Sequence, residues 1–219
     1  MANRITHSKG SIISTLAISH ILLSYRHDGE KGNNMNVAVH AGHAVRGSRG
    51  ATGYMDEVKK NRLLKKYMIK YLKQKKVTVK DLSVHSGTQS KVLTGIKSNF
   101  EKKCKKGVWL NISLHLNSSP SAKANGFELW VSPEMYNDKQ KLMNLNALCE
   151  EVCERTGFTN RGVKKTHCLY VTKNLPNCIL FEVGFVSSKK DFGIYEKMHS
   201  KCIACVIADC VLKYGKELL

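Results

Sequence analysis

Apolar residues alternate with polar ones in several short segments of the chain, a pattern that is typical of β-strands. The clearest strand covers residues 108–116, with an aliphatic residue at every second position and Trp109, Asn111, Ser113 and His115 between them. His115 therefore faces the polar side near the carboxyl end of this strand. The same reasoning predicts shorter strands at residues 36–40, 77–84, 127–131, 169–172 and 179–183.

Helical spacing of apolar residues predicts four helices, at residues 56–75, 90–103, 139–156 and 195–212. Lysines fill the other face of the first helix, as on a solvated surface. Because strands and helices alternate, we predict an α/β fold. It would be a single domain with a largely parallel or mixed sheet of about six strands, flanked by helices on both faces.

Composition supports a globular domain, since 42% of the 219 residues are hydrophobic and 24% are charged. A membrane span needs about 20 apolar residues, and no such run occurs, so we expect no membrane partner. Residues 12–25 resemble a weak signal segment, but polar residues interrupt it and no cleavage motif follows. We interpret residues 1–34 as an extension outside the domain, residues 35–219 as the domain, and Met35 as the natural start. Synthesis in the cytoplasm without an export signal is expected.

The net charge indicates the kind of partner that the protein attracts, and the cysteines indicate their redox state. Lys and Arg number 36 against 17 Asp and Glu, a net charge of +19, which should attract polyanions such as nucleic acid or an anionic cell wall. The eight cysteines are irregularly spaced, and Cys202 and Cys205 lie in an apolar helical stretch without a second pair. We therefore predict reduced, mostly buried thiols.

Three side chains with metal-binding chemistry fall at element boundaries. His43 follows the first strand, Glu57 begins the first helix and His115 ends the central strand. The carboxyl ends of strands form the functional crevice of open α/β sheets, and two histidines with one glutamate are a recurrent catalytic zinc set. Glu182 ends the last core strand and can reach the same edge. Each residue alone has a structural explanation, but together they favour a zinc hydrolase with a separate carboxylate base.

Six ordered segments carry a family resemblance: VAVHAGH, GATGYMDEVKKN, SLHLNSS, GFELWV, RGVKKTHCLYV and LFEVGFVSS. From about Met35 to the C-terminus, the chain resembles the zinc-dependent N-acetylmuramoyl-L-alanine amidases. It is similar in particular to the catalytic domains of clostridial phage endolysins. His40 departs from the family, where this neighbour of the Gly-His pair is often acidic or apolar.

The resemblance implies Zn²⁺ held by His43, Glu57 and His115, with Glu182 as the catalytic residue. Glu57 is preferred over Asp56 because the family acid precedes an asparagine by four residues, here Asn61. The implied reaction cleaves the amide between the lactyl group of N-acetylmuramic acid and L-alanine of peptidoglycan.

The resemblance also suggests substrate contacts by Asn117, Arg161 and Lys164, with Lys165 beside them. The chain ends soon after its last helix, which leaves no room for a wall-binding module. We therefore expect the basic surface to hold teichoic acid in its place. We favour a phage endolysin, which a pore-forming partner would release, over an autolysin.

Two other functions stay open from the residues alone. A zinc peptidase that cuts elsewhere in the wall peptide has the same ligand types. A non-enzymatic protein that binds polyanions fits the charge, but aromatic residues are only 7% of the chain. They are not interleaved with most basic runs, which argues against nucleic acid as the partner.

Overall fold

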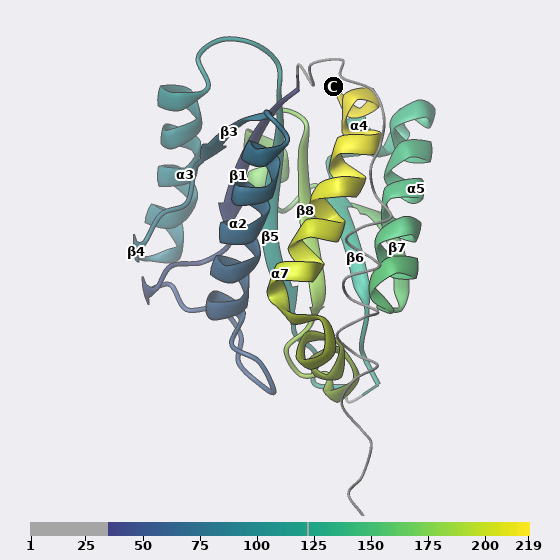
Figure 1. Cartoon of the computed structure of the whole chain (residues 1–219). Coiled ribbons are helices and arrows are strands. Elements are labelled where there is room, and N and C mark those ends of the chain that lie inside the picture. Colours follow the sequence, from purple (N-terminus) through teal and green to yellow (C-terminus); the bar gives the residue numbers. More distant parts are fainter. Residues whose placement is uncertain (1–34, 122) are drawn as a thin grey trace, which may run out of the picture. The chain divides into compact units, whose positions relative to one another are not determined.

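The computed structural model describes residues 35–121 and 123–219. Its centre is a six-stranded mixed sheet. The interpretation of residues 1–34 as an extension lies outside this described part. The strand order is β3-β1-β5-β8-β6-β7 (Figure 1). The strands are β1 (Asn36–Ala41), β3 (Thr78–Asp81), β5 (Trp109–Asn117), β6 (Phe127–Val131), β7 (Asn160–Lys165) and β8 (Cys178–Phe185).

Most neighbouring strands are parallel. The pairs β1–β3, β1–β5, β5–β8 and β6–β7 run in the same direction, whereas β6 runs antiparallel to β8. The predicted α/β fold with a mixed sheet of six strands is therefore confirmed. A two-stranded ribbon, β2 (Arg46–Gly47) with β4 (Ser86–Gly87), lies apart from this sheet.

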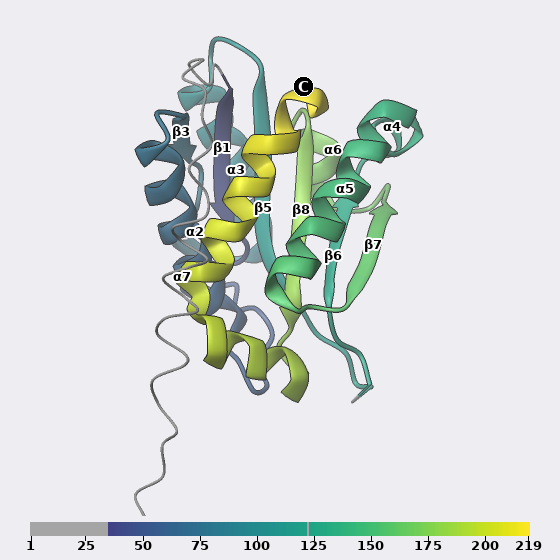
Figure 2. The ribbon, with the colours of Figure 1, turned by 45° about the vertical axis from the view of Figure 1, so that its right-hand side comes forward.

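Helices cover both faces of the sheet. On one face lie α2 (Glu57–Gln74), α5 (Lys139–Thr156) and α7 (Lys189–Tyr214), and on the other lie α3 (Gln89–Lys103) and α6 (Tyr170–Asn174), as Figures 1 and 2 show. The short α4 (Pro133–Asn137) precedes α5, and a 3-10 turn (Gly215–Leu218) follows α7.

Two apolar clusters follow from the alternation along the strands. The larger cluster joins Leu110, Ile112 and Leu114 of β5 to the helices α2, α5 and α7. The smaller cluster lies on the opposite face, where Trp109 and Leu180 meet α3 and α6. Polar residues of β5 and β8 that share this second face are therefore available to a site at its edge.

The sequence also sets where α2 begins. Asp56 precedes the helix, and its Oδ1 accepts a hydrogen bond from the Lys59 amide over 2.9 Å, as an N-cap does. This capping role occupies Asp56 and leaves the next carboxylate, Glu57, in the first turn with its side chain buried.

Some sequence-based elements need correction. The predicted strand at residues 169–172 is wrong, because Tyr170–Asn174 forms α6. The short β7 was not predicted, and β3 is shorter than the predicted strand at 77–84. The last helix begins earlier than expected, and within it His199 has non-helical angles (φ 58°, ψ 154°), which mark a kink.

The cysteine prediction agrees with the structure. All eight cysteines are free, and five of them are buried: Cys104, Cys149, Cys153, Cys178 and Cys210. No helix in the described part of the chain combines the length and apolar character that a membrane crossing requires.

Candidate metal centre

His43, Glu57 and His115 meet at the carboxyl edge of the sheet. Glu57 Oε1 lies 3.3 Å from His43 Nε2 and 3.0 Å from His115 Nδ1. One nitrogen or oxygen from each of the three side chains lies within 4.8 Å of the others. Within residues 35–121 and 123–219, no second group of three His, Cys, Asp or Glu side chains meets in this way.

The loop after β1 brings His43 to this point. His43 has a left-handed backbone (φ 59°), which is uncommon for a residue with a side chain. Its carbonyl accepts a 2.6 Å hydrogen bond from Arg62 Nη2, which also donates to the Val84 carbonyl. Gly42 is required beside it, since a Cβ there would lie only 2.0 Å from His115 Cε1. The backbone and Arg62 thus hold the two imidazoles close together.

Glu57 is held on both carboxylate oxygens. Oε2 accepts a 2.8 Å hydrogen bond from the Ala51 amide, while Oε1 lies 3.3 Å from the Leu116 amide and 3.4 Å from Asn61 Nδ2. Burial raises the pKa of Glu57, but hydrogen bonds to His115 and His43 outweigh it and hold the pKa well below its usual value. The carboxyl is therefore ionised and fixed in place.

The donor set fits Zn²⁺. Two imidazoles and one carboxylate direct nitrogen and oxygen donors toward a common point, which is the composition of a catalytic zinc site with a position left for water. His43 Nδ1 is buried without a hydrogen-bonding partner. The contact between Asn61 and Glu57 is consistent with the choice of Glu57 over Asp56.

Glu182 lies directly beside His115 in the sheet. The two residues are cross-strand partners in the β5–β8 pair, so their side chains share a face. Glu182 Oε2 is shielded from solvent and has no hydrogen-bonding partner. Burial raises the pKa of Glu182 well above its usual value, and the nearby carboxylates of Glu57 and Glu128 raise it further. The group is therefore suited to hold a proton near the candidate metal centre.

Glu128 is a component of this site that the sequence analysis missed. It is the cross-strand partner of Glu182 on the antiparallel strand β6 and is only 1% exposed. Burial raises its pKa, but hydrogen bonds from Lys164, Arg161 and Trp130 outweigh burial and lower the pKa. His115, Glu182 and Glu128 consequently form one row across three strands.

The three residues predicted to contact substrate all hydrogen-bond to Glu128. Asn117 Nδ2 and Arg161 Nε donate to its oxygens over 2.9 and 2.6 Å, and Lys164 Nζ donates as well. Lys165 lies elsewhere, with its ammonium 5.5 Å from the ring centre of Tyr136. The structure thus gives Asn117, Arg161 and Lys164 an internal partner. These contacts depend on which strand positions are paired, and the sequence alone does not give that pairing.

The chain is similar in sequence to a family of known proteins. The family model for N-acetylmuramoyl-L-alanine amidases matches residues 37–212. The chain belongs to this family. The match includes residues of all six strands and the helices between them, together with His43, Glu57, His115 and Glu182.

Two curated proteins are similar to this chain in sequence. An uncharacterized 38.4 kDa protein of Clostridium perfringens is 28% identical over 188 residues, which cover 84% of this chain and 53% of the relative. A second uncharacterized C. perfringens protein is 27% identical over 81% of this chain and 51% of the relative. The chain therefore spans about half the length of the curated relatives that it matches.

Two solved structures share the fold. The catalytic domain of the CD27L endolysin, which targets Clostridia difficile, superimposes with a TM-score of 0.67 at 23% identity, covering 82% of this chain and 98% of that domain. The catalytic domain of the amidase CwlV from Bacillus (Paenibacillus) polymyxa gives a TM-score of 0.68 at 24% identity, covering 83% and 99%. At this identity the likeness concerns the fold.

Proposed function

We propose that this protein is a zinc-dependent N-acetylmuramoyl-L-alanine amidase. It would hydrolyse the amide that joins the lactyl group of N-acetylmuramic acid to L-alanine of the peptidoglycan stem peptide. The convergence of His43, Glu57 and His115 within 4.8 Å, in a chain of this family, is the observation that carries the proposal.

Four side chains would divide the work. His43, Glu57 and His115 would hold the ion, and Glu57 is already fixed by backbone amides before any ion binds. When bound, zinc lowers the pKa of a coordinated water to about 7 and polarises the scissile carbonyl. Glu182 would take the proton from the attacking water and deliver it to the amine of L-alanine, which leaves poorly unless protonated. Glu182 Oε2 has no hydrogen-bonding partner within the described part of the protein, which leaves it free to exchange a proton with the substrate.

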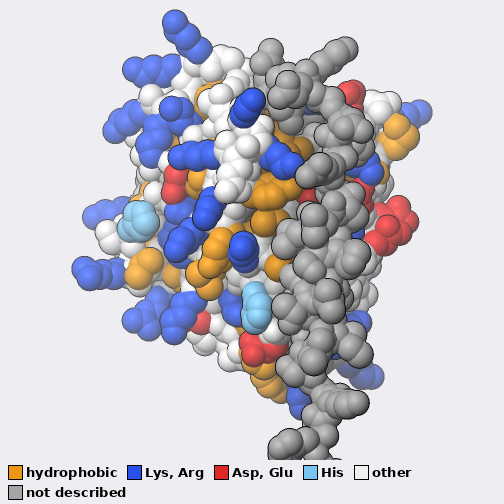
Figure 3. All heavy atoms as spheres, viewed as in Figure 1, with side chains coloured by type: hydrophobic (Ala, Val, Ile, Leu, Met, Phe, Trp, Pro, Cys, Tyr) orange, Lys and Arg blue, Asp and Glu red, His pale blue; other side chains and the backbone are white. Residues whose placement is uncertain are grey.

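We propose that this activity serves to lyse the cell wall. Peptidoglycan is the substrate implied by the family, and the structural relatives include the catalytic domain of an endolysin. Lys and Arg side chains gather over the half of the molecule that contains α2 (Figure 3). We propose that this surface binds the phosphate groups of wall teichoic acid.

Replacing Glu182 tests the catalytic assignment. Glu182→Gln keeps the size of the side chain but cannot accept the proton, so we expect hydrolysis of purified walls to fall at least ~100-fold. Because no metal ligand changes, the variant should bind one zinc ion as the wild type does. Mass spectrometry of the products, with metal analysis of both proteins, measures the two quantities.

Metal removal and the identity of the products provide the controls. Chelation should abolish activity, and added Zn²⁺ should restore it. Free lactyl groups on the glycan together with stem peptides that begin at L-alanine identify an amidase. Peptides cut at another bond would identify a zinc peptidase, and full activity in the chelated protein would refute the zinc mechanism.

A further inference from the structure

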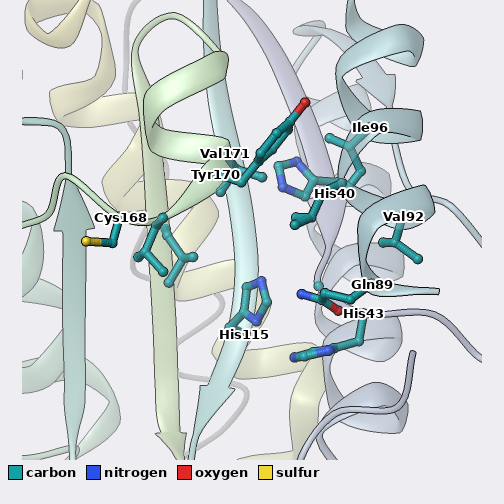
Figure 4. Close-up of a pocket in the computed structure, with 13 residues that line it drawn as sticks. His40, His43, Gln89, Val92, Ile96, His115, Cys168, Tyr170 and Val171 are labelled. Carbon is teal, nitrogen blue, oxygen red and sulfur yellow. The ribbon is translucent and has the colours of Figure 1, made fainter.

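A cavity beside the candidate metal centre is more apolar than the rest of the site. It has a volume of about 250 Å³, and His43 and His115 lie at one side of it (Figure 4). Its walls come from α3 and α6, through Val92, Ile96 and Val171. None of the residues that line it is Lys, Arg, Asp or Glu, so the cavity is unsuited to a charged ligand group.

His40 is the unusual component of this lining. The residue is 0% exposed, and neither ring nitrogen has a hydrogen-bonding partner. Figure 4 shows its imidazole beside Tyr170, on the same side of the cavity as α3. Leaving a buried polar group without a partner costs about 1–3 kcal/mol, and native structures seldom do so without a functional reason. The two nitrogens therefore indicate a ligand that supplies the missing partners.

The protonation state of His40 determines which ligand groups can form hydrogen bonds with it. His40 is fully buried, and burial favours the uncharged imidazole because the charged form loses its hydration. A neutral imidazole offers one N–H donor and one nitrogen acceptor. A secondary amide has the complementary pair, a carbonyl acceptor and an N–H donor, and a methyl group attached to it would suit the aliphatic walls.

The N-acetylmuramoyl group contains such an amide close to the bond that is cut. Its acetamido group and its lactyl ether stand on adjacent carbons of the sugar ring. We propose that the cavity receives the acetamido group of the substrate, with His40 as its hydrogen-bonding partner; this proposal rests on the amidase function proposed above. The space would hold about eight water molecules at ~30 Å³ each, which is ample for an acetamido group and the adjacent edge of the ring.

The proposal also orients the substrate. On the other side of His115 the row continues through Glu182 to Glu128, Arg161 and Lys164, where charged groups gather. The uncharged sugar substituent would lie on the side of α3 and α6. The stem peptide, with its carboxylates, would leave toward β6 and β7.

Binding of two neutral ligands tests the proposal without catalysis. One ligand is N-acetylmuramoyl-L-alanine methylamide, and the other has a hydroxyl group in place of the acetamido group. Calorimetry with the zinc-loaded Glu182→Gln protein should give a Kd at least ~10-fold weaker for the hydroxyl ligand, the ratio that corresponds to 1.4 kcal/mol. In the added His40→Leu background, the two Kd values should lie within about twofold of each other because the polar partner is gone.

A second variant guards against misfolding of His40→Leu. Leu93 lines the cavity from α3 but is only half-buried, so Leu93→Trp should fill the cavity and leave the fold intact. It should weaken the acetamido ligand by about 10-fold and leave the hydroxyl ligand nearly unchanged. The matched control is Leu63→Trp on α2, at a position that is 39% exposed and does not line the cavity. It should change neither Kd.

Equal Kd values for the two ligands in the Glu182→Gln protein would overturn the proposal. An unchanged Kd of the acetamido ligand in the Leu93→Trp protein would overturn it too, because the acetamido group would then bind outside the cavity. In both cases the wild type would still release stem peptides from walls, and the amidase function would stand. If the wild type cleaved no wall amide, the function itself would fall, and the assignment of the cavity with it.

Discussion

At the scale of single residues, the site depends on side chains that are fixed before any ligand arrives. Glu57 is held by two backbone amides, and the loop of His43 is held by Arg62. That His43, Glu57, His115 and Glu182 lie at one edge of the sheet could be predicted from sequence, because each falls at the end of an element and within a family motif. Glu128 could not be predicted, since nothing in its own segment shows that its partners come from β5 and β7. The unpartnered state of the His40 nitrogens likewise became visible only in three dimensions.

Gly42→Ala tests how closely the imidazoles must approach. The added Cβ would lie 2.0 Å from His115 Cε1 and 2.2 Å from Nε2, so His115 must move. We expect zinc affinity and wall hydrolysis each to fall at least ~100-fold, since a shift of about 1 Å at a reacting centre has effects of that size. Metal titration and product release measure both quantities.

Gly193→Ala is the matched control for this change. Gly193 lies in α7, and a Cβ there would meet no heavy atom within 4 Å. Replacement should leave activity unchanged and raise the free energy of unfolding by about 0.5–1 kcal/mol, because alanine loses less backbone freedom in a helix. Normal zinc affinity in Gly42→Ala would contradict the close approach of Gly42 and His115.

At the scale of elements, we expect the edge strand β7 to depend on a buried charge. Arg161 and Lys164 of β7 both reach Glu128 of β6 across the strand pair. This explains why β7 was missed: its sequence, NRGVKK, has one aliphatic residue and no alternation. The mistaken strand at 169–172 has a related cause, because a short apolar run does not distinguish a strand from a buried helical turn. Long periodic segments such as α5 and β5 were predicted well, since their patterns persist over many residues.

Glu128→Gln tests this dependence. The amide keeps the shape but loses the charge that Arg161 and Lys164 engage, so we expect a loss of about 1–3 kcal/mol in the free energy of unfolding at neutral pH. The pKa of Glu128 is lowered by folding. Its contribution is therefore fully present above the pKa of the unfolded carboxyl, near 4.5, and is lost as pH falls through the lower folded value. Denaturant titrations of both proteins from pH 7 to pH 3 should converge at the acid end.

An exposed glutamate provides the comparison for this experiment. Glu101 on α3 pairs with Lys97 at the surface, where ion pairs contribute little. Glu101→Gln should change the free energy of unfolding by less than about 0.5 kcal/mol at any pH in this range. A difference between wild type and Glu128→Gln that does not shrink with falling pH would show that the ionised carboxylate is not what stabilises β7.

At the scale of the whole molecule, we propose that the net charge of +19 governs encounters with the wall. Exposed lysines follow α2 and the turn after it, among them Lys66, Lys70, Lys73 and Lys76. Salt shortens the range of such attraction, since the Debye length falls from about 10 Å at 0.1 M to about 3 Å at 1 M. The surface should therefore matter for polymeric, charged walls and little for small neutral substrates.

Salt dependence of lysis tests the role of this surface. Hydrolysis of walls that carry teichoic acid should fall steeply between about 0.1 and 1 M salt, whereas hydrolysis of a small neutral muramoyl peptide should hardly change. Replacing Lys66, Lys70 and Lys73 together by Glu exchanges three positive charges for three negative ones, so the net charge falls from +19 to +13. This variant should lose wall activity at low salt and keep its activity on the small substrate.

Walls stripped of phosphate polymers complete the comparison. On them the wild type and the charge variant should act at similar rates, because no polyanion attracts either protein. Equal lysis of untreated walls at low and at molar salt would show that the cationic surface has no part in the choice of target.

The row formed by His115, Glu182 and Glu128 also makes the activity sensitive to how the strands slide past one another. A strand displaced by one residue turns every side chain to the opposite face, so Glu182 would enter the apolar layer and Phe181 would replace it beside His115. The packing of Phe127 against Phe181 on the far side of the sheet opposes such a slip. Weakening that aromatic contact should therefore abolish wall hydrolysis while the helices stay folded, a loss that far-UV circular dichroism would hardly register.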